Sequence, residues 1–209
     1  MYTKRPEDYP VSLRSCCVFS GLFAAASLSC ASPITFVFDG VASGTVGGVN
    51  FSNAPFKFTQ SSDTSLITSS SNGFSTNYTT PFASGASINV GGFGAGTITT
   101  VTDVANSFDI FNPANSFVAF ALTTGGDVAG HDLTFASYKL QSAVGPITTT
   151  NPFVSNFSAA STLGNIAFSG INSLTFTATT GPIPEPGSFS LLGAGVLLLV
   201  FTRWFSHGR

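Results

Sequence analysis

Alternating apolar and polar positions recur along the middle of the chain, in short runs separated by turn residues. Residues 34–38 (ITFVF) end at Asp39-Gly40, and residues 56–59 (FKFT) place both phenylalanines on one side and Lys57 on the other. A period of two is typical of a strand with one buried face. We therefore predict one strand at 34–38 and another at 56–59.

Further runs predict further strands. The nearly all-apolar run 116–122 is typical of a central strand. The other predicted strands are 87–90, 96–101, 108–111, 133–140 and 174–179. Asn72-Gly73, Gly91-Gly92 and Gly125-Gly126 supply turns, and the Ser/Thr/Asn-rich stretch 61–80 predicts a long surface loop or an edge hairpin.

Together these runs predict an all-β domain over residues 32–181. Many short strands with turn signals and no convincing helix favour an antiparallel β-sandwich of the jelly-roll type. The sequence has no fixed-period repeat, which argues against a solenoid or a propeller.

Composition narrows the function classes. Charged residues make up 8% of the chain, against roughly 25% in an ordinary soluble domain. The formal net charge of −2 cannot neutralise phosphates, so we expect no nucleic-acid partner. With 43% hydrophobic residues and 22 phenylalanines, the chain is also unlike a disordered tail.

The first 31 residues have the layout of a secretory signal peptide. Basic residues stand at Lys4, Arg5 and Arg14, the run 16–28 is apolar, and Ser29 and Ala31 are small. This pattern predicts export through the secretion translocon and cleavage by signal peptidase after Ala31.

All three cysteines, Cys16, Cys17 and Cys30, lie within this leader. The domain 32–181 therefore has no disulfide and no thiolate metal site. The alternative is a lipoprotein with Cys30 as the lipidated residue, but the position three before Cys30 holds Ser27, where a Leu-like residue is expected.

The C-terminal residues predict a membrane anchor. Residues 187–205 reach roughly 28 Å as a helix, close to the hydrocarbon thickness of a bilayer. Arg203 and Arg209 follow the apolar run and place this end in the cytoplasm. The alternative is a buried helix of a soluble domain. The predicted anchor residues are Phe189, Leu191, Leu192, Val196, Leu197, Leu198, Leu199, Val200 and Phe201.

The tripeptide Pro184-Glu185-Pro186, the Gly/Leu/Ala-rich run after it and the basic end together resemble the PEP-CTERM sorting signal of Gram-negative bacteria. This region is also labelled an ice-binding-protein C-terminal domain. The resemblance covers residues 182–209. It implies recognition by an exosortase, a membrane-embedded cysteine-type transpeptidase, which would act near this tripeptide on an inner-membrane intermediate. The usual tail is a dense Arg run, whereas only Arg203, Arg209 and His207 are basic here.

Candidate catalytic groups in the domain are few. Its one histidine is His131, and no G-x-S-x-G elbow precedes a helix. A secreted hydrolase would need His131 within hydrogen-bond reach of both a Ser and an Asp. Asp103 and Asp109 are a candidate glycosidase pair, with two exposed loop carboxylates as the alternative. We predict that the protein is not an enzyme and uses no cofactor.

Binding candidates are equally sparse. Asp127 and Asp132 are candidate Ca²⁺ ligands in a loop, with a polar turn as the favoured alternative. Glycan-binding modules stack sugars on exposed Tyr or Trp, and the domain offers only Tyr78 and Tyr138. Ice binding would favour regular Thr ladders on a flat face. Thr alternates at 97–99 and 175–177, but ordinary strands also place Thr at outward positions.

The sequence therefore predicts an exported protein, sorted by an exosortase to the cell surface or extracellular matrix. We expect a structural or adhesive role in envelope, biofilm or exopolysaccharide, with extracellular polysaccharide as a partner. A carbohydrate-binding module is the alternative. Two lysines and six aspartates remain in residues 32–181, so this segment has a formal net charge of −4, and its exposed Ser and Thr are candidate glycosylation sites.

Overall fold

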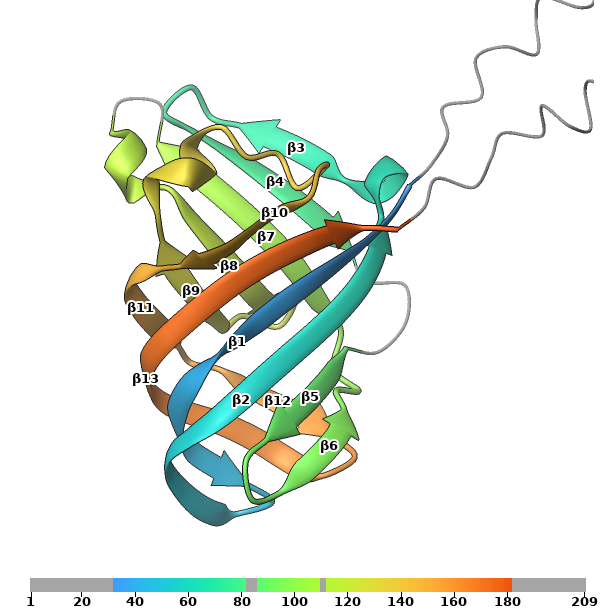
Figure 1. The fold of residues 1–209 in the computed structure, drawn as a ribbon, viewed down its shortest axis with the longest axis vertical. Coiled ribbons are helices and arrows are strands. Elements are labelled where there is room, and N and C mark those ends of the chain that lie inside the picture. Colours follow the sequence, from blue (N-terminus) through green and yellow to red (C-terminus); the bar gives the residue numbers. More distant parts are fainter. Residues whose placement is uncertain (1–31, 82–85, 110–111, 182–209) are drawn as a thin grey trace, which may run out of the picture. The chain divides into compact units, whose positions relative to one another are not determined.

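The computed structural model describes residues 32–81, 86–109 and 112–181. The predicted signal peptide and the sorting segment 182–209 lie outside them. The described chain belongs to one compact unit, Ala31–Glu185, and is all-β, with two antiparallel sheets (Figure 1). In the part of the chain described here, no helix is long and apolar enough to cross a membrane.

Sheet A has seven strands in the order β10-β13-β1-β2-β5-β6, with β12 paired to β13. Its strands are β1 (Pro33–Val46), β2 (Val49–Asp63), β5 (Ser87–Val90), β6 (Gly94–Thr97), β10 (Val144–Thr148), β12 (Ser158–Ser161) and β13 (Gly164–Thr180). The long strands β13, β1 and β2 lie side by side in the middle of this sheet (Figure 1).

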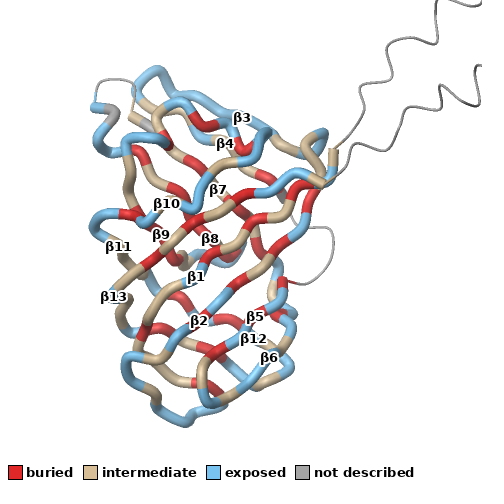
Figure 2. Tube along the Cα trace, viewed as in Figure 1, coloured by how far each residue is buried: buried red, intermediate tan, exposed pale blue. Residues whose placement is uncertain are grey.

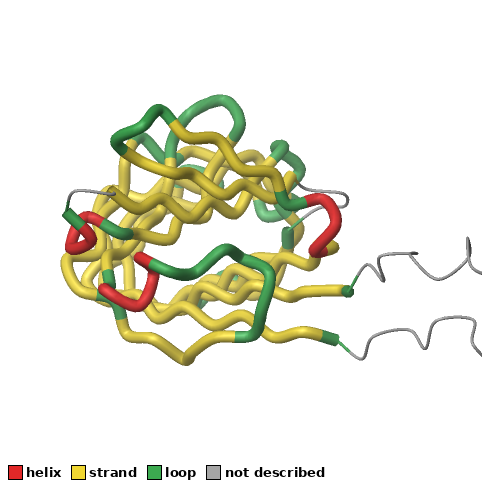
Figure 3. Tube along the Cα trace, turned by 90° about the horizontal axis from the view of Figure 1, so that it is seen from above, coloured by secondary structure: helices red, strands yellow, loops and turns green. Residues whose placement is uncertain are grey.

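Sheet B has six strands in the order β11-β9-β8-β7-β4-β3. They are β3 (Thr68–Ser71), β4 (Ser75–Pro81), β7 (Thr102–Asp109), β8 (Phe117–Leu122), β9 (Asp127–His131) and β11 (Thr150–Ser155). Three short 3₁₀ turns complete the described elements: η1 (Thr64–Leu66), η2 (Pro113–Asn115) and η3 (Leu133–Ala136). Seen from above, the strands form two layers (Figure 3).

The core lies between the sheets and is built largely from phenylalanine. Phe58 of sheet A stacks on Phe120 of sheet B, and Phe38 meets the same ring edge-on. Buried positions recur along the inner sides of the strands (Figure 2). The largest fully buried aromatic side chains are Phe36, Phe38, Phe58, Phe120, Phe135, Phe157 and Phe176.

Sheet A closes on itself at one end. Ile98, just after β6, forms an antiparallel bridge with Ser161 of β12, and the amide of Thr99 donates to the carbonyl of Ala160 at 2.8 Å. Since β12 also pairs with β13, the strands β13, β1, β2, β5, β6 and β12 form a continuous ring. This pairing satisfies backbone groups that an open edge would present to other chains.

Two glycines allow β1 and β13 to approach closely. A Cβ on Gly40 would lie 2.0 Å from the carbonyl oxygen of Ser173, and one on Gly44 would lie 2.0 Å from that of Ala167. The register of β1 on β13 shifts between Val41 and Ala42 and again between Ser43 and Gly44. Glycine is therefore required where the strand bends and its backbone meets its neighbour.

Most predicted strands are confirmed in place but not in length. The runs 34–38, 56–59, 87–90 and 174–179 fall in β1, β2, β5 and β13, and the run 116–122 contains β8. The strands β1, β2 and β13 are longer than predicted, at 14, 15 and 17 residues. The predictions at 96–101 and 108–111 were displaced, because β6 ends at Thr97 and β7 runs from Thr102 to Asp109. The strands β9, β10, β11 and β12 were missed.

The strand predicted at 133–140 was wrong. The carboxylate of Asp132 accepts a hydrogen bond from the Thr134 amide at 2.8 Å and begins η3. The chain then continues as bends and loop to Leu140, whose φ is 61°. Phe135, Tyr138 and Leu140 are all buried, so the apolar spacing reflects burial of a loop and not a strand.

The stretch 61–80 contains the edge hairpin, one of its two predicted alternatives. It joins β3 to β4 through Asn72-Gly73, where Gly73 has a φ of 85°. The side-chain oxygen of Asn72 accepts hydrogen bonds from the amides of Phe74 and Ser75 at 2.9 and 2.8 Å. The turns at Gly91-Gly92 and Gly125-Gly126 are likewise confirmed.

Candidate functional site

The outward side of β7, β8 and β9 gathers the chemically distinctive side chains of the domain. Val118, Phe120 and Leu122 of β8 are buried against the core, so the alternate residues of this strand point outward. The strand register carries the same division to β7 and β9. We call this surface the β7–β9 face.

Two carboxylates occupy one row of the β7–β9 face. Asp103 and Asp127 both pair with Ala121, one from each side, which places their Cα atoms about 10 Å apart across two strand spacings. Ser155 of β11 continues the row beyond Asp127. A small side chain therefore separates two acidic ones.

Partial burial raises the pKa of both Asp103 and Asp127 above the ordinary value of an aspartate. A backbone hydrogen bond acts in the opposite direction at Asp127. Desolvation disfavours the charged form, so both groups take up protons more readily than a solvated carboxyl. They can accept hydrogen bonds from hydroxyl groups when ionised and donate when protonated.

Three aromatic rings form a cluster on the same face. His131 contacts Phe117 at 5.7 Å and Phe153 at 5.6 Å between ring centroids, and the two phenylalanines meet edge-on at 6.2 Å. Between this cluster and the acidic row lie Ala119 and Ala129, both buried. The face thus presents half-buried aromatic rings and carboxylates on either side of small residues.

The geometry of His131 does not assemble a catalytic triad. Its Nδ1 is buried and has no hydrogen-bond partner, whereas a triad orients the imidazole through one ring nitrogen and uses the other as the base. A hydrolase would need both a Ser and an Asp within hydrogen-bond reach of this ring, and Nδ1 bonds to neither.

The other predicted carboxylate pairs are not brought together. Asp127 begins β9 and Asp132 follows its last residue, so they lie about 16 Å apart at the rise of a strand. The polar turn favoured for this segment was wrong, because residues 127–131 form a strand paired with β8 and β11, and only Asp132 acts as a cap, at the start of η3. Asp103 and Asp109 lie at opposite ends of β7, about 20 Å apart, which exceeds the separation a glycosidase uses. Among the described residues no cluster of three metal-ligating side chains occurs.

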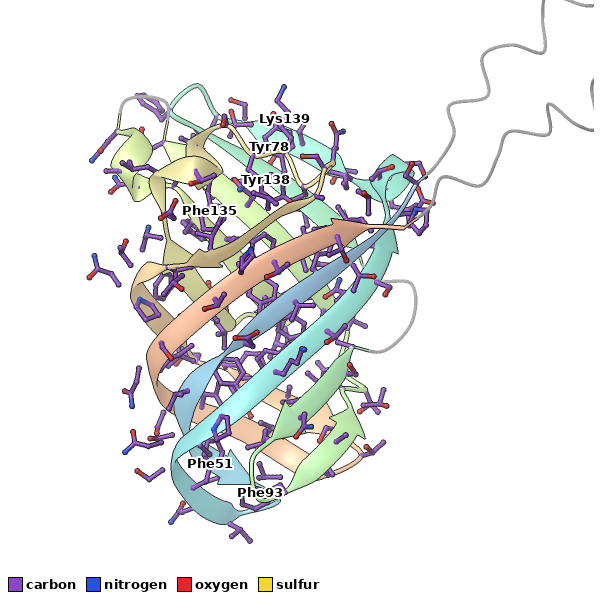
Figure 4. All side chains as sticks on the ribbon, in the orientation of Figure 1. Phe51, Tyr78, Phe93, Phe135, Tyr138 and Lys139 are labelled. Atoms are coloured by element: carbon purple, nitrogen blue, oxygen red, sulfur yellow. The ribbon has the colours of Figure 1, made fainter. Side chains whose placement is uncertain are left out.

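The tyrosines do not form an exposed platform. Tyr138 is buried, and its hydroxyl donates to the carbonyl of Ser142 at 3.0 Å. Tyr78 packs against the hydrophobic core. Both lie at one end of the domain, with Phe51 and Phe93 at the other (Figure 4).

Sequence reasoning missed the aromatic cluster that the register assembles instead. Phe117 and Phe153 are far apart in the chain, and only the order β8-β9-β11 brings them to His131. The apolar run 116–122 carried one signal, since an alternating strand with a solvated outer face would have polar residues at Phe117, Ala119 and Ala121.

The outward side of sheet A is different: it is rich in hydroxyl groups, and its charged residues include Asp39 and Lys57, which pair across β1 and β2. Its members include two rows of cross-strand neighbours. Thr35 and Ser61 share a side-chain hydrogen bond of 3.1 Å in the first row. We call this surface the hydroxyl face, and its two rows are Thr179-Thr35-Ser61 and Thr177-Val37-Thr59-Ser87-Thr97.

No protein-family model, curated protein or solved structure matches this chain. The two distinctive surfaces of the domain are the β7–β9 face and the hydroxyl face.

Proposed function

We propose that this protein is a PEP-CTERM-type surface protein, exported under the direction of residues 1–31 and sorted by an exosortase through residues 182–209. The proposal rests on the order of three sequence features: Pro184-Glu185-Pro186, an apolar run and a basic end. Its delivered part is the domain 32–181, with a structural or adhesive role in the cell envelope or matrix.

The observation that best supports this role is the position of the two ends of the domain. The amide of Gly181 donates to the carbonyl of Pro33 at 2.8 Å, and Ile34 pairs with Thr180. The chain therefore enters and leaves the domain at one place. A tether at this place would leave both sheet faces accessible to matrix components.

The two sheets are consistent with a β-sandwich of jelly-roll type as the displayed unit. Supporting this finer description are the two strand layers (Figure 3) and the contact of Phe58 with Phe120 between them. A thiol-free domain of this kind needs no oxidative folding step after export.

The partner that suits these surfaces is a neutral polysaccharide. A formal net charge of −4 for residues 32–181 disfavours acidic glycans through repulsion. Hydroxyl groups such as those of Thr35 and Thr59 can both donate to and accept from sugar hydroxyls. The hydroxyl face therefore fits adhesion through many weak contacts.

Mass spectrometry tests the sorting step. The protein is isolated from an exosortase-positive strain and from its exosortase deletion. We expect the C-terminal peptide to be absent from the first sample and present in the second. Recovery of the intact C-terminal peptide from both strains would contradict the proposal.

The second candidate is a carbohydrate-binding module, favoured by the β7–β9 face. The cluster of Phe117, His131 and Phe153 offers apolar area to a sugar ring. Asp103 and Asp127 stand within the same strand layer to accept hydrogen bonds from sugar hydroxyls.

A further inference from the structure

The interior changes from apolar to polar along β2. Its inward positions are Phe56, Phe58, Gln60 and Ser62, and all four are buried. The first two belong to the phenylalanine core. The second two bring an amide and a hydroxyl into the same space between the sheets.

Two contacts between the sheets fix what lies opposite Gln60. Phe58 stacks on Phe120 with ring centroids 4.4 Å apart, and Ser62 shares a buried side-chain hydrogen bond of 2.5 Å with Thr80. Gln60 is midway between these anchors along β2.

On sheet B the same two anchors are joined by one row. Phe120 pairs with Val104, and Val104 pairs with Thr80. The midpoint of that row is Val104, so Gln60 lies over this part of β7. The inward neighbours of Val104 along β7 are Thr102 and Asn106, both fully buried.

These facing residues leave four buried polar atoms without a hydrogen-bond partner. They are Nε2 and Oε1 of Gln60, Oγ1 of Thr102 and Oδ1 of Asn106. Asn106 makes one long bond, from Nδ2 to the Phe135 carbonyl at 3.4 Å. Buried polar groups in native proteins are almost always satisfied, and an unsatisfied amide between the sheets would oppose folding.

We propose that the interior between β2 and β7 is a binding site for ordered water, with Gln60 as its central ligand and Thr102 as the partner across the space. The unsatisfied atoms include a donor, two acceptors and a hydroxyl that does both. Water supplies both functions without charge and is small enough for a closely packed interior. It joins polar groups too far apart for a direct bond.

The first test is nuclear magnetic resonance on the full chain. The side-chain amide signals of Gln60 are assigned by their loss in Gln60→Leu. We expect cross-peaks from these protons to long-lived bound water. Their absence would overturn the proposal, and so would a small organic molecule released on denaturation and detected by mass spectrometry.

The second test asks whether Thr102 shares the water. The folding equilibrium constant is measured for Gln60→Leu, Thr102→Val and the double variant. A shared water predicts coupling of about threefold or more, with the double variant less destabilised than the two single changes imply. Additive effects would exclude Thr102 as the partner and overturn the site as proposed.

A matched control uses two threonines of the hydroxyl face. Thr59 and Thr177 both pair with Val37, so they stand two strands apart on the outward side of sheet A. We expect the Thr59→Val and Thr177→Val changes to be additive because bulk water solvates both hydroxyls. Coupling in this pair as large as in the buried pair would show that coupling between single and double variants does not report an internal water.

Discussion

The ring of Phe58 in β2 lies parallel to that of Phe120 in β8, at 4.4 Å between centroids and with an interplanar angle of 0°. Both side chains are fully buried. Phe58 also packs against Phe157 and Phe168, so one residue connects sheet A to sheet B and to the closed end of sheet A. This contact therefore lies within the hydrophobic core that joins the two sheets.

Phe58→Ala should lower the free energy of unfolding by about 3–5 kcal/mol, because it removes a large buried side chain and leaves a cavity. Urea titration followed by circular dichroism measures the change. Val101→Ala is the control, since Val101 is 58% exposed and its truncation should cost about 0.5 kcal/mol or less. Equal effects of the two changes would contradict the assigned core.

Gly40→Ala should destabilise the domain by about 2 kcal/mol or more, since the new methyl group meets the Ser173 carbonyl and overlap of this kind forces the backbone to move. Gly170→Ala is the matched control in the partner strand, because nothing lies within 4 Å of its added Cβ. The same urea titration compares them. A tolerated Gly40→Ala would argue against the close approach of β1 and β13.

Stability should fall above about pH 10, the ordinary pKa of a tyrosine, because burial raises the pKa of Tyr138. The unfolded chain releases this proton near pH 10 whereas the folded domain retains it. The stabilisation is therefore complete below about pH 10 and is lost as pH rises toward the folded pKa. Tyr138→Phe should flatten this part of the stability curve. An unchanged slope in the variant would contradict the burial of this hydroxyl.

If the β7–β9 face binds glycans, Phe153→Ala should weaken retention by a neutral polysaccharide about tenfold, as expected for the loss of one stacking contact. Affinity gel electrophoresis with neutral and acidic polysaccharides measures the retention. Leu133→Ala is the control, since Leu133 is 68% exposed and is not part of the cluster. Equal retention of Phe153→Ala and the parent protein would exclude this face as the site.

Local patterning predicted the all-β class and the position of most strands, because alternation such as Phe56-Lys57-Phe58 reports directly on a half-buried strand. It underestimated the long strands at Gly40 and Gly44, where turn-like residues continue a bent strand. It also predicted only the end of β7, whose residues Thr102–Asp109 owe their strand to pairing with β4 and β8.

The candidate site depended on long-range register and so was beyond local patterns. Phe153 reaches His131 only through the pairing of β11 with β9, and Asp103 reaches the row of Asp127 only through Ala121 of β8. The sequence offered only Tyr78 and Tyr138 as candidate sugar platforms, and Tyr138 is buried in the core.

Surface sorting is the central claim, and replacing Pro184-Glu185-Pro186 by three alanines tests it most directly. Cells producing the parent protein or this variant are fractionated into membrane, cell surface and matrix, and the domain 32–181 is quantified in each fraction. We predict that the parent domain reaches the surface or matrix while the variant remains in the membrane fraction. The same distribution for both proteins would contradict exosortase sorting through this motif.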